Sequence, residues 1–133
     1  MKQLSELLAR DSLDEIQLPP VSKMDLIKYA GASGDFNPIH LIEEEAIKSG
    51  LPGIIAHGMW TMGQLSSLFN PYLQIGFIKK YTVRFKGMIF LKDVISLNAH
   101  KEKKEGDIVY FKTIAKNQKD NIVMQGTVEF LLI

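Results

Sequence analysis

Residues 29–40 read YAGASGDFNPIH and bring a carboxylate, an amide and an imidazole into one short loop. Pro38 disfavours helical angles for the residue before it and has no backbone N–H, so the segment cannot continue as one regular helix. Gly31 and Gly34 allow the backbone angles of a sharp exit from a helix. We therefore expect a helix that stops at Gly31, followed by a bend that brings Asp35 and His40 close together.

Two interpretations of this loop are open from the residues alone. A single water held between Asp35 and His40 would be a nucleophile, because both side chains can accept a proton from it. The plainer interpretation is that Asp35 and Asn37 form side-chain turns and that His40 is a hydrogen-bonded interior histidine. Taken singly, each residue favours the plainer interpretation. Their combination favours a catalytic site.

The combination resembles the signature of the MaoC-like, R-specific hydratase and dehydratase family. The matching positions are Tyr29, Gly34, Asp35, Asn37, Pro38, His40 and Ala46. The resemblance continues through residues 55–63, IAHGMWTMG, and covers about two thirds of the chain. Within the family, these two segments most resemble the sequence of the catalytic subunit of bacterial 3-hydroxyacyl-acyl-carrier-protein dehydratases. The resemblance implies an α+β hot-dog fold, with an antiparallel sheet wrapped around a long central helix, in one domain over residues 1–133.

The resemblance also implies an activity and a set of site residues. The expected enzyme is a hydro-lyase that interconverts R-3-hydroxyacyl and trans-2-enoyl thioesters of CoA or acyl carrier protein, without a metal or redox cofactor. Asp35 and His40 would hold the water, and Asn37 would support the loop. The backbone N–H of Gly58 would stabilise the thioester oxygen at a helix N-terminus. Ser66 occupies the position of a serine seen near the pair in some R-hydratases.

Alternatives remain for several of these residues and for the function. Gly58 is equally well explained as a turn glycine before a helix, and Ser66 as a small residue for close helix packing. His57 is expected to be structural rather than catalytic. At the level of function, the rivals are a hot-dog acyl thioesterase and a thioester-binding partner subunit of a heterodimeric dehydratase. Neither rival gives a reason for the loop from Asp35 to His40.

Hydrophobic periodicity predicts an antiparallel sheet packed on a buried helix. Apolar side chains surround nearly the whole helical wheel of residues 59–69, so something must cover this helix on most sides. The following segments alternate apolar and polar residues, as half-buried strands of a meander do. The predicted helices are residues 4–9, 22–31, 43–48 and 59–69, the strands are near residues 16–18, 80–86, 95–100, 108–115 and 122–132, and the later turns are residues 101–107 and 117–121.

The composition excludes several other classes of protein. With 16 cationic and 15 anionic residues in 133, the net charge of +1 does not fit a nucleic-acid-binding protein. Residues 49–78 lack charged side chains, but polar residues interrupt them too often for a membrane span. The chain has no cysteine, and no apolar signal region follows its start. We expect a cytoplasmic enzyme.

Two features bear on the carrier and on assembly. Residues 88–93, MIFLKD, replace the Pro-rich turn ending in Gly-Asp that relatives usually show, so the hairpin here is expected to be built differently. Cations at Lys79, Lys80, Arg84 and Lys86 fit either phosphates and an acidic carrier protein or a plain solvated strand face. Because a single hot-dog layer leaves one face poorly covered, we expect a homodimer, or a heterodimer with a related subunit.

Overall fold

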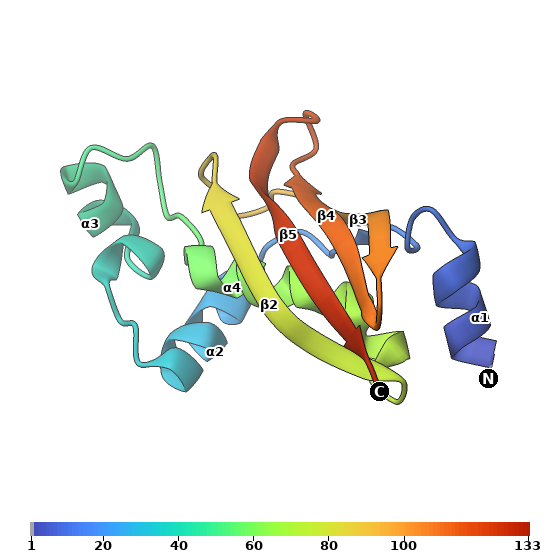
Figure 1. The fold of residues 1–133 in the computed structure, drawn as a ribbon. Helices are drawn as coiled ribbons and strands as arrows, with labels where there is room; N and C mark the ends of the chain where they lie inside the picture. Colours follow the sequence, from blue (N-terminus) through green and yellow to red (C-terminus); the bar gives the residue numbers. More distant parts are fainter. Residues whose placement is uncertain (1) are drawn as a thin grey trace.

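The computed structural model describes residues 2–133, in which an antiparallel sheet curls around one buried helix (Figure 1). The order of strands in the sheet is β1-β3-β4-β5-β2, and each neighbouring pair is antiparallel. The expected α+β arrangement of an antiparallel sheet around a helix is confirmed. The five strands are β1 (Ile16–Gln17), β2 (Gly76–Phe85), β3 (Ser96–Glu105), β4 (Ile108–Lys116) and β5 (Ile122–Leu132).

The prediction of a simple meander is wrong for one strand. Strands β3, β4 and β5 follow one another as hairpins, but β2 pairs with β5 rather than with β3. Alternation along a strand determines which residues face the core, but it carries no information about the neighbouring strand. Gly126 marks this pairing, because a Cβ there would collide with the carbonyl oxygen of Thr82. The close approach of β5 to β2 therefore requires glycine at this position.

The central helix is shorter than predicted. Helix α4 spans Gly58–Ser66 and continues as a 3-10 segment, η2, over Ser67–Tyr72. The change of geometry begins where two serine hydroxyls donate hydrogen bonds to carbonyls of the preceding turn, Ser66 to Gly63 O at 2.6 Å and Ser67 to Gln64 O at 2.5 Å. Such bonds compete with regular helical bonding. Pro71, inside η2, also cannot donate a helical hydrogen bond.

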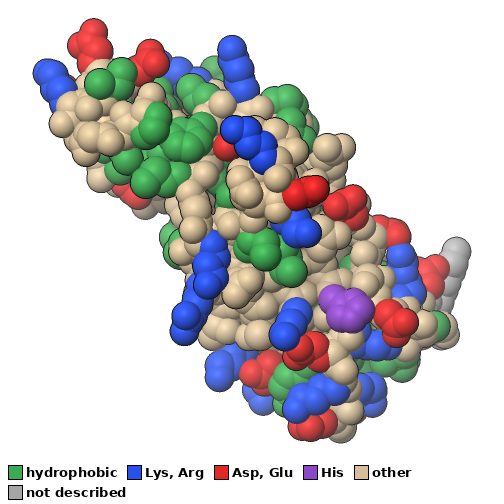
Figure 2. Space-filling view, turned by 90° about the horizontal axis from the view of Figure 1, so that it is seen from above, with side chains coloured by type: hydrophobic (Ala, Val, Ile, Leu, Met, Phe, Trp, Pro, Cys, Tyr) green, Lys and Arg blue, Asp and Glu red, His purple; other side chains and the backbone are tan. Residues whose placement is uncertain are grey.

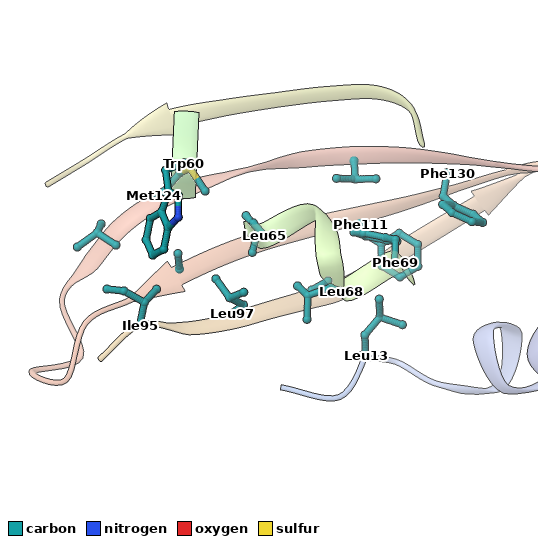
Figure 3. Packing of buried hydrophobic residues seen from close by; sticks show 14 of the residues in the cluster. Leu13, Trp60, Leu65, Leu68, Phe69, Ile95, Leu97, Phe111, Met124 and Phe130 are labelled. Carbon is teal, nitrogen blue, oxygen red and sulfur yellow. The ribbon is translucent and has the colours of Figure 1, made fainter. Parts of the chain in front are cut away.

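The hydrophobic core lies between α4–η2 and the inner face of the sheet (Figure 3). Trp60, Leu65, Leu68 and Phe69 come from α4–η2 and are buried. Phe69 lies edge-on to Phe111 of β4, with ring centroids 5.1 Å apart. The expectation that the helix is covered on most sides is confirmed for these residues. This packing fixes the position of α4, and therefore of its N-terminus, relative to β2.

The hairpin between β3 and β4 also differs from the prediction. A turn was expected over residues 101–107, but β3 continues to Glu105 and only two residues separate it from β4. Gly106, with φ 61°, supplies the left-handed angle of this tight turn. The charged residues of β3 misled the prediction because the strand extends beyond the core, where both of its faces meet solvent. The expected short strand near residues 16–18 is present as β1.

A short arm of helices extends past the free edge of β2 (Figure 1). It comprises α2 (Lys23–Ser33), the 3-10 turn η1 (Pro38–His40) and α3 (Glu43–Lys48). Helix α1 (Lys2–Ala9) lies at the opposite end of the molecule. In Figure 2, hydrophobic side chains gather at the end that carries the arm. Within residues 2–133, no helix is long and apolar enough to cross a membrane.

The connection from β2 to β3 is held by a buried carboxylate. Asp93 accepts hydrogen bonds from the N–H of Phe90 at 2.9 Å and from the side-chain amide of Gln118 at 3.0 Å. Lys92, just before it, has φ 73°, an angle that favours glycine. Lys92 therefore adopts a strained backbone conformation in this turn.

Candidate active site

Helix α2 directly precedes the loop that carries Asp35, and it ends later than predicted. Ser22 and Asp25 form a capping box at its start, with two reciprocal hydrogen bonds of 3.1 Å. The expected stop at Gly31 is wrong, because the helix continues to Ser33 and Gly34 supplies the left-handed cap with φ 79°. A single glycine inside a helix costs only about 1 kcal/mol, so Gly31 is tolerated.

The loop after α2 is built from side-chain turns. The N–H of Asp35 donates to Ser33 Oγ at 3.2 Å, and the N–H of Asn37 donates to Asp35 Oδ1 at 3.1 Å. Asn37 Oδ1 then accepts from the N–H of Ile39 at 3.3 Å and caps η1. The plainer interpretation of Asp35 and Asn37 is therefore present in the structure. It does not exclude the catalytic interpretation, because Asp35 Oδ2 has no part in these turns.

His40 is held in one orientation at the end of this loop. Its ring is 8% exposed, and Nδ1–H donates to the carbonyl oxygen of Ile55 at 2.7 Å. Because a carbonyl can only accept, this bond leaves Nε2 as the free ring nitrogen. Asp35 and His40 each place a polar atom within 4.8 Å of the other. Two hydrogen bonds of about 2.8 Å that meet at one water span about 4.6 Å, so a separation of this size is the one that a bridging water needs.

His57, which we expect to be structural rather than catalytic, contacts both residues of this pair. It lies between the arm and α4, 2% exposed, and its Nε2–H donates to the backbone oxygen of Asp35 at 3.0 Å. Its ring stacks on His40 with centroids 3.9 Å apart and the planes inclined by 25°. The ring of Tyr29 also contacts His57 edge-on, with ring centroids 4.8 Å apart and the planes inclined by 61°. In the sequence, only the position of His57 directly before Gly58 indicates that it lies near the site.

Asp35, His40 and His57 are spaced as the ligands of a metal ion can be, with one atom of each within 4.8 Å of the others. The ring orientation does not suit that use. Ring nitrogens bind a metal through lone pairs that lie in the ring plane, and the two imidazoles are stacked. Their lone pairs therefore run nearly side by side instead of converging. The arrangement is better suited to hydrogen bonds with a shared water.

Gly58 begins α4 beside these residues. The first N–H groups of a helix have no acceptor within the helix and carry the positive end of its dipole. A Cβ on Gly58 would lie 3.0 Å from the ring of Phe85 on β2, so this ring packs closely against the start of the helix. The close approach of Phe85 gives a structural reason for glycine at this position, and the oxyanion role of Gly58 stays a prediction.

The hydrogen bond that the structure gives Ser66 involves neither Asp35 nor His40. Its hydroxyl donates to Gly63 O within the same helix. Eight residues of helix separate it from Gly58, which is about 12 Å along the axis. This contact tests neither interpretation of Ser66, so its role at the site and its role in helix packing both stay predictions.

The cations predicted on β2 are exposed at the surface. Tyr81 reaches Met62 O of α4 with its hydroxyl, so the alternate residues of β2 point away from the helix. Among these, Arg84 lines a hollow of about 470 Å³ on the outer face of the sheet, together with Thr82 and Gln125. This hollow lies on the face opposite to α4 and does not include Asp35 or His40. The cations are therefore placed as in a solvated strand face.

These features define a class of protein: a sheet wrapped around a helix, with an Asp–His pair at the helix N-terminus. The profile of the family described as MaoC like domain matches residues 9–125. The chain belongs to this family. The structure superimposes on an (R)-hydratase from A. caviae involved in PHA biosynthesis with a TM-score of 0.82, at 20% identity, over 94% of this chain and 98% of that one. This likeness confirms the hot-dog fold.

Two relatives with similar sequences are named dehydratases. A 3-hydroxybutyryl-CoA dehydratase of Methylorubrum extorquens is 31% identical over 88 residues, which are 64% of this chain and 55% of the relative. A mitochondrial 3-hydroxyacyl-[acyl-carrier-protein] dehydratase of Arabidopsis thaliana is 26% identical over 116 residues, 84% of this chain and 70% of the relative. The chain spans only 5% of a matching fatty acid synthase subunit beta of Saccharomyces cerevisiae.

Proposed function

We propose that the protein is a hydro-lyase that adds water to trans-2-enoyl thioesters and removes it from R-3-hydroxyacyl thioesters. The observation that carries this proposal is the placement of Asp35 and His40 within 4.8 Å of each other, beside the N-terminus of α4. The carboxylate and His40 Nε2 both accept hydrogen bonds, so together they orient a water through both of its hydrogens. Family membership and the names of the relatives support the same reaction class.

Hydration then proceeds by proton transfer around one bound water. The water oxygen attacks carbon 3 of the enoyl group while one of the pair, Asp35 or His40, takes its proton. Electrons move through carbon 2 to the thioester oxygen, which gains negative charge. The N–H of Gly58 donates to this oxygen. The residue that took the proton from the water then delivers it to carbon 2, which completes the addition and restores the starting protonation of the pair. Dehydration is the reverse sequence.

The magnitudes show that both parts of the site are needed. A positioned general acid or base contributes about 10²–10⁴ in rate. One backbone donor at an oxyanion is worth about 10²–10³. Since the two act on different atoms of the same transition state, neither part alone accounts for a full enzymatic acceleration, which starts at about 10⁶.

The test is a hydration assay at the absorbance of the enoyl thioester, with crotonyl, octenoyl and longer chains on both CoA and acyl carrier protein. Chiral analysis of the product should give the R alcohol, because that is the outcome in the family. An S product would contradict the assignment. Release of free thiol without hydration would favour the thioesterase, and no reaction on any substrate would favour a partner subunit.

We further propose that the protein acts as a homodimer. Strand β2 ends the sheet, so one of its edges has no neighbouring strand within residues 2–133. Near that edge, large hydrophobic side chains are exposed on β2, α4 and the arm, namely Phe36, Ile42, Ile47, Met59, Phe77 and Phe85. A second copy would cover them. Light scattering should report about twice 15.0 kDa. A monomer at micromolar concentration would contradict this, unless a related subunit restores a heterodimer.

A further inference from the structure

The side chain of His57 contacts both members of the proposed pair. Its Nε2–H binds the backbone oxygen of Asp35, and its ring lies against the ring of His40. It is also the residue before Gly58, at the start of α4. The bond from His57 therefore joins the loop that carries Asp35 directly to the start of the core helix.

The hydrogen bonding of His57 is incomplete. Since the carbonyl of Asp35 must accept, the proton lies on Nε2, and the other nitrogen, Nδ1, is buried without a partner. A buried polar atom without a partner destabilises the folded state. An apolar side chain of similar reach would avoid that cost. What the histidine supplies in return is the donor to Asp35, which an apolar residue cannot provide.

We propose that His57 is a positioning residue, which fixes the backbone of Asp35 so that its carboxylate faces the water shared with His40. The proposal rests on the hydration activity proposed above. It assigns to His57 an effect on turnover through Asp35, with no contact to the substrate. A hydrogen bond that sets geometry should change kcat more than KM, because a displaced carboxylate still permits binding while it misplaces the water.

The test compares two substitutions of equal reach, His57→Gln and His57→Met. The amide nitrogen of glutamine and the methyl group of methionine both occupy about the place of Nε2, but only the amide donates. We expect His57→Gln to keep kcat within about threefold of the wild type. We expect His57→Met to lower kcat at least tenfold, with KM within about threefold and an equal or higher melting temperature. His100→Met, at an exposed histidine, is the matched control and should leave kcat unchanged.

A second arm tests whether the effect passes through Asp35. On an Asp35→Asn background, His57→Met should lower the residual kcat by less than about twofold, because the positioned carboxylate is already gone. Equal tenfold losses on both backgrounds would overturn the proposal, as would wild-type kcat in His57→Met. If His57→Met does not fold, His57→Gln decides, and a loss above tenfold at an unchanged melting temperature overturns it. An inactive wild type would instead reject the proposed function itself.

Discussion

Substituting Gly58 by alanine tests the oxyanion site with little damage to the fold. The new Cβ would lie 3.0, 3.2 and 3.2 Å from three carbons of the Phe85 ring, where ordinary contact begins near 3.4 Å. The ring must therefore move by a few tenths of an ångström. Phe85 is 52% exposed, so the ring can move toward solvent at small cost. Alanine also favours a helix over glycine by about 1 kcal/mol, so the free energy of unfolding should change by less than about 1 kcal/mol.

The proposed oxyanion role predicts a different response of activity, because a methyl group beside the Gly58 N–H would hinder the approach of the thioester oxygen. Loss of one such donor lowers kcat by about 10²–10³. The assay is hydration of crotonyl and octenoyl thioesters at saturating substrate, with thermal unfolding measured on the same preparation. The expected result is a large fall in kcat at a nearly unchanged melting temperature.

Gly63, on the same helix, provides the control. A Cβ there meets nothing within 4 Å, so Gly63→Ala should add about 0.5–1 kcal/mol of stability and leave kcat at the wild-type value. Wild-type kcat in Gly58→Ala would refute the oxyanion assignment. An equal loss of kcat in both variants would show that the helix tolerates no added methyl group, and would also remove the specific role of Gly58.

Three further substitutions test the surroundings of the site. Asn37→Ala removes the cap on η1 and should cost about 0.5–2 kcal/mol in urea unfolding, while kcat falls less than in Asp35 variants; a larger fall in kcat would give Asn37 a chemical role. Lys92→Gly relieves a left-handed residue and should stabilise by about 0.5–1 kcal/mol; destabilisation would contradict the strain at φ 73°. Burial raises the pKa of Tyr81, so the folded state keeps this hydroxyl protonated. Stability from this group is complete below about pH 10 and is lost as the pH rises further, and Tyr81→Phe should show a smaller alkaline loss.

The sequence predicted the parts of the fold that local patterns determine. The alternation on β3, β4 and β5 and the all-round apolar surface of α4 identified the sheet and its buried helix. The order of strands could not be predicted, because pairing of β2 with β5 depends on contacts far apart in the chain. The helix end was misplaced by one turn, since Gly31 and Gly34 are equivalent in sequence and only Gly34 has the left-handed angle.

For the site, the sequence identified the loop and the helix start but not how they are joined. Asp35, Asn37 and His40 are close in the chain, so their spacing could be interpreted directly. The contact between His57 and Asp35 spans 22 residues, and neither residue type nor periodicity predicts it. The serine at position 66 was named from the resemblance, and its contact within its own helix became visible only in the structure.

The most direct test of the central claim is the turnover of Asp35→Asn, His40→Gln and the double variant in the hydration assay. Because both side chains act on one water, each single change should lower kcat by about 10² or more, and the double change should cost much less than the product of the two. All three variants should stay folded and keep the oligomeric state of the wild type. Near-wild-type hydration, together with a melting temperature several degrees lower, would mean that the loop is structural and that the catalytic assignment is wrong.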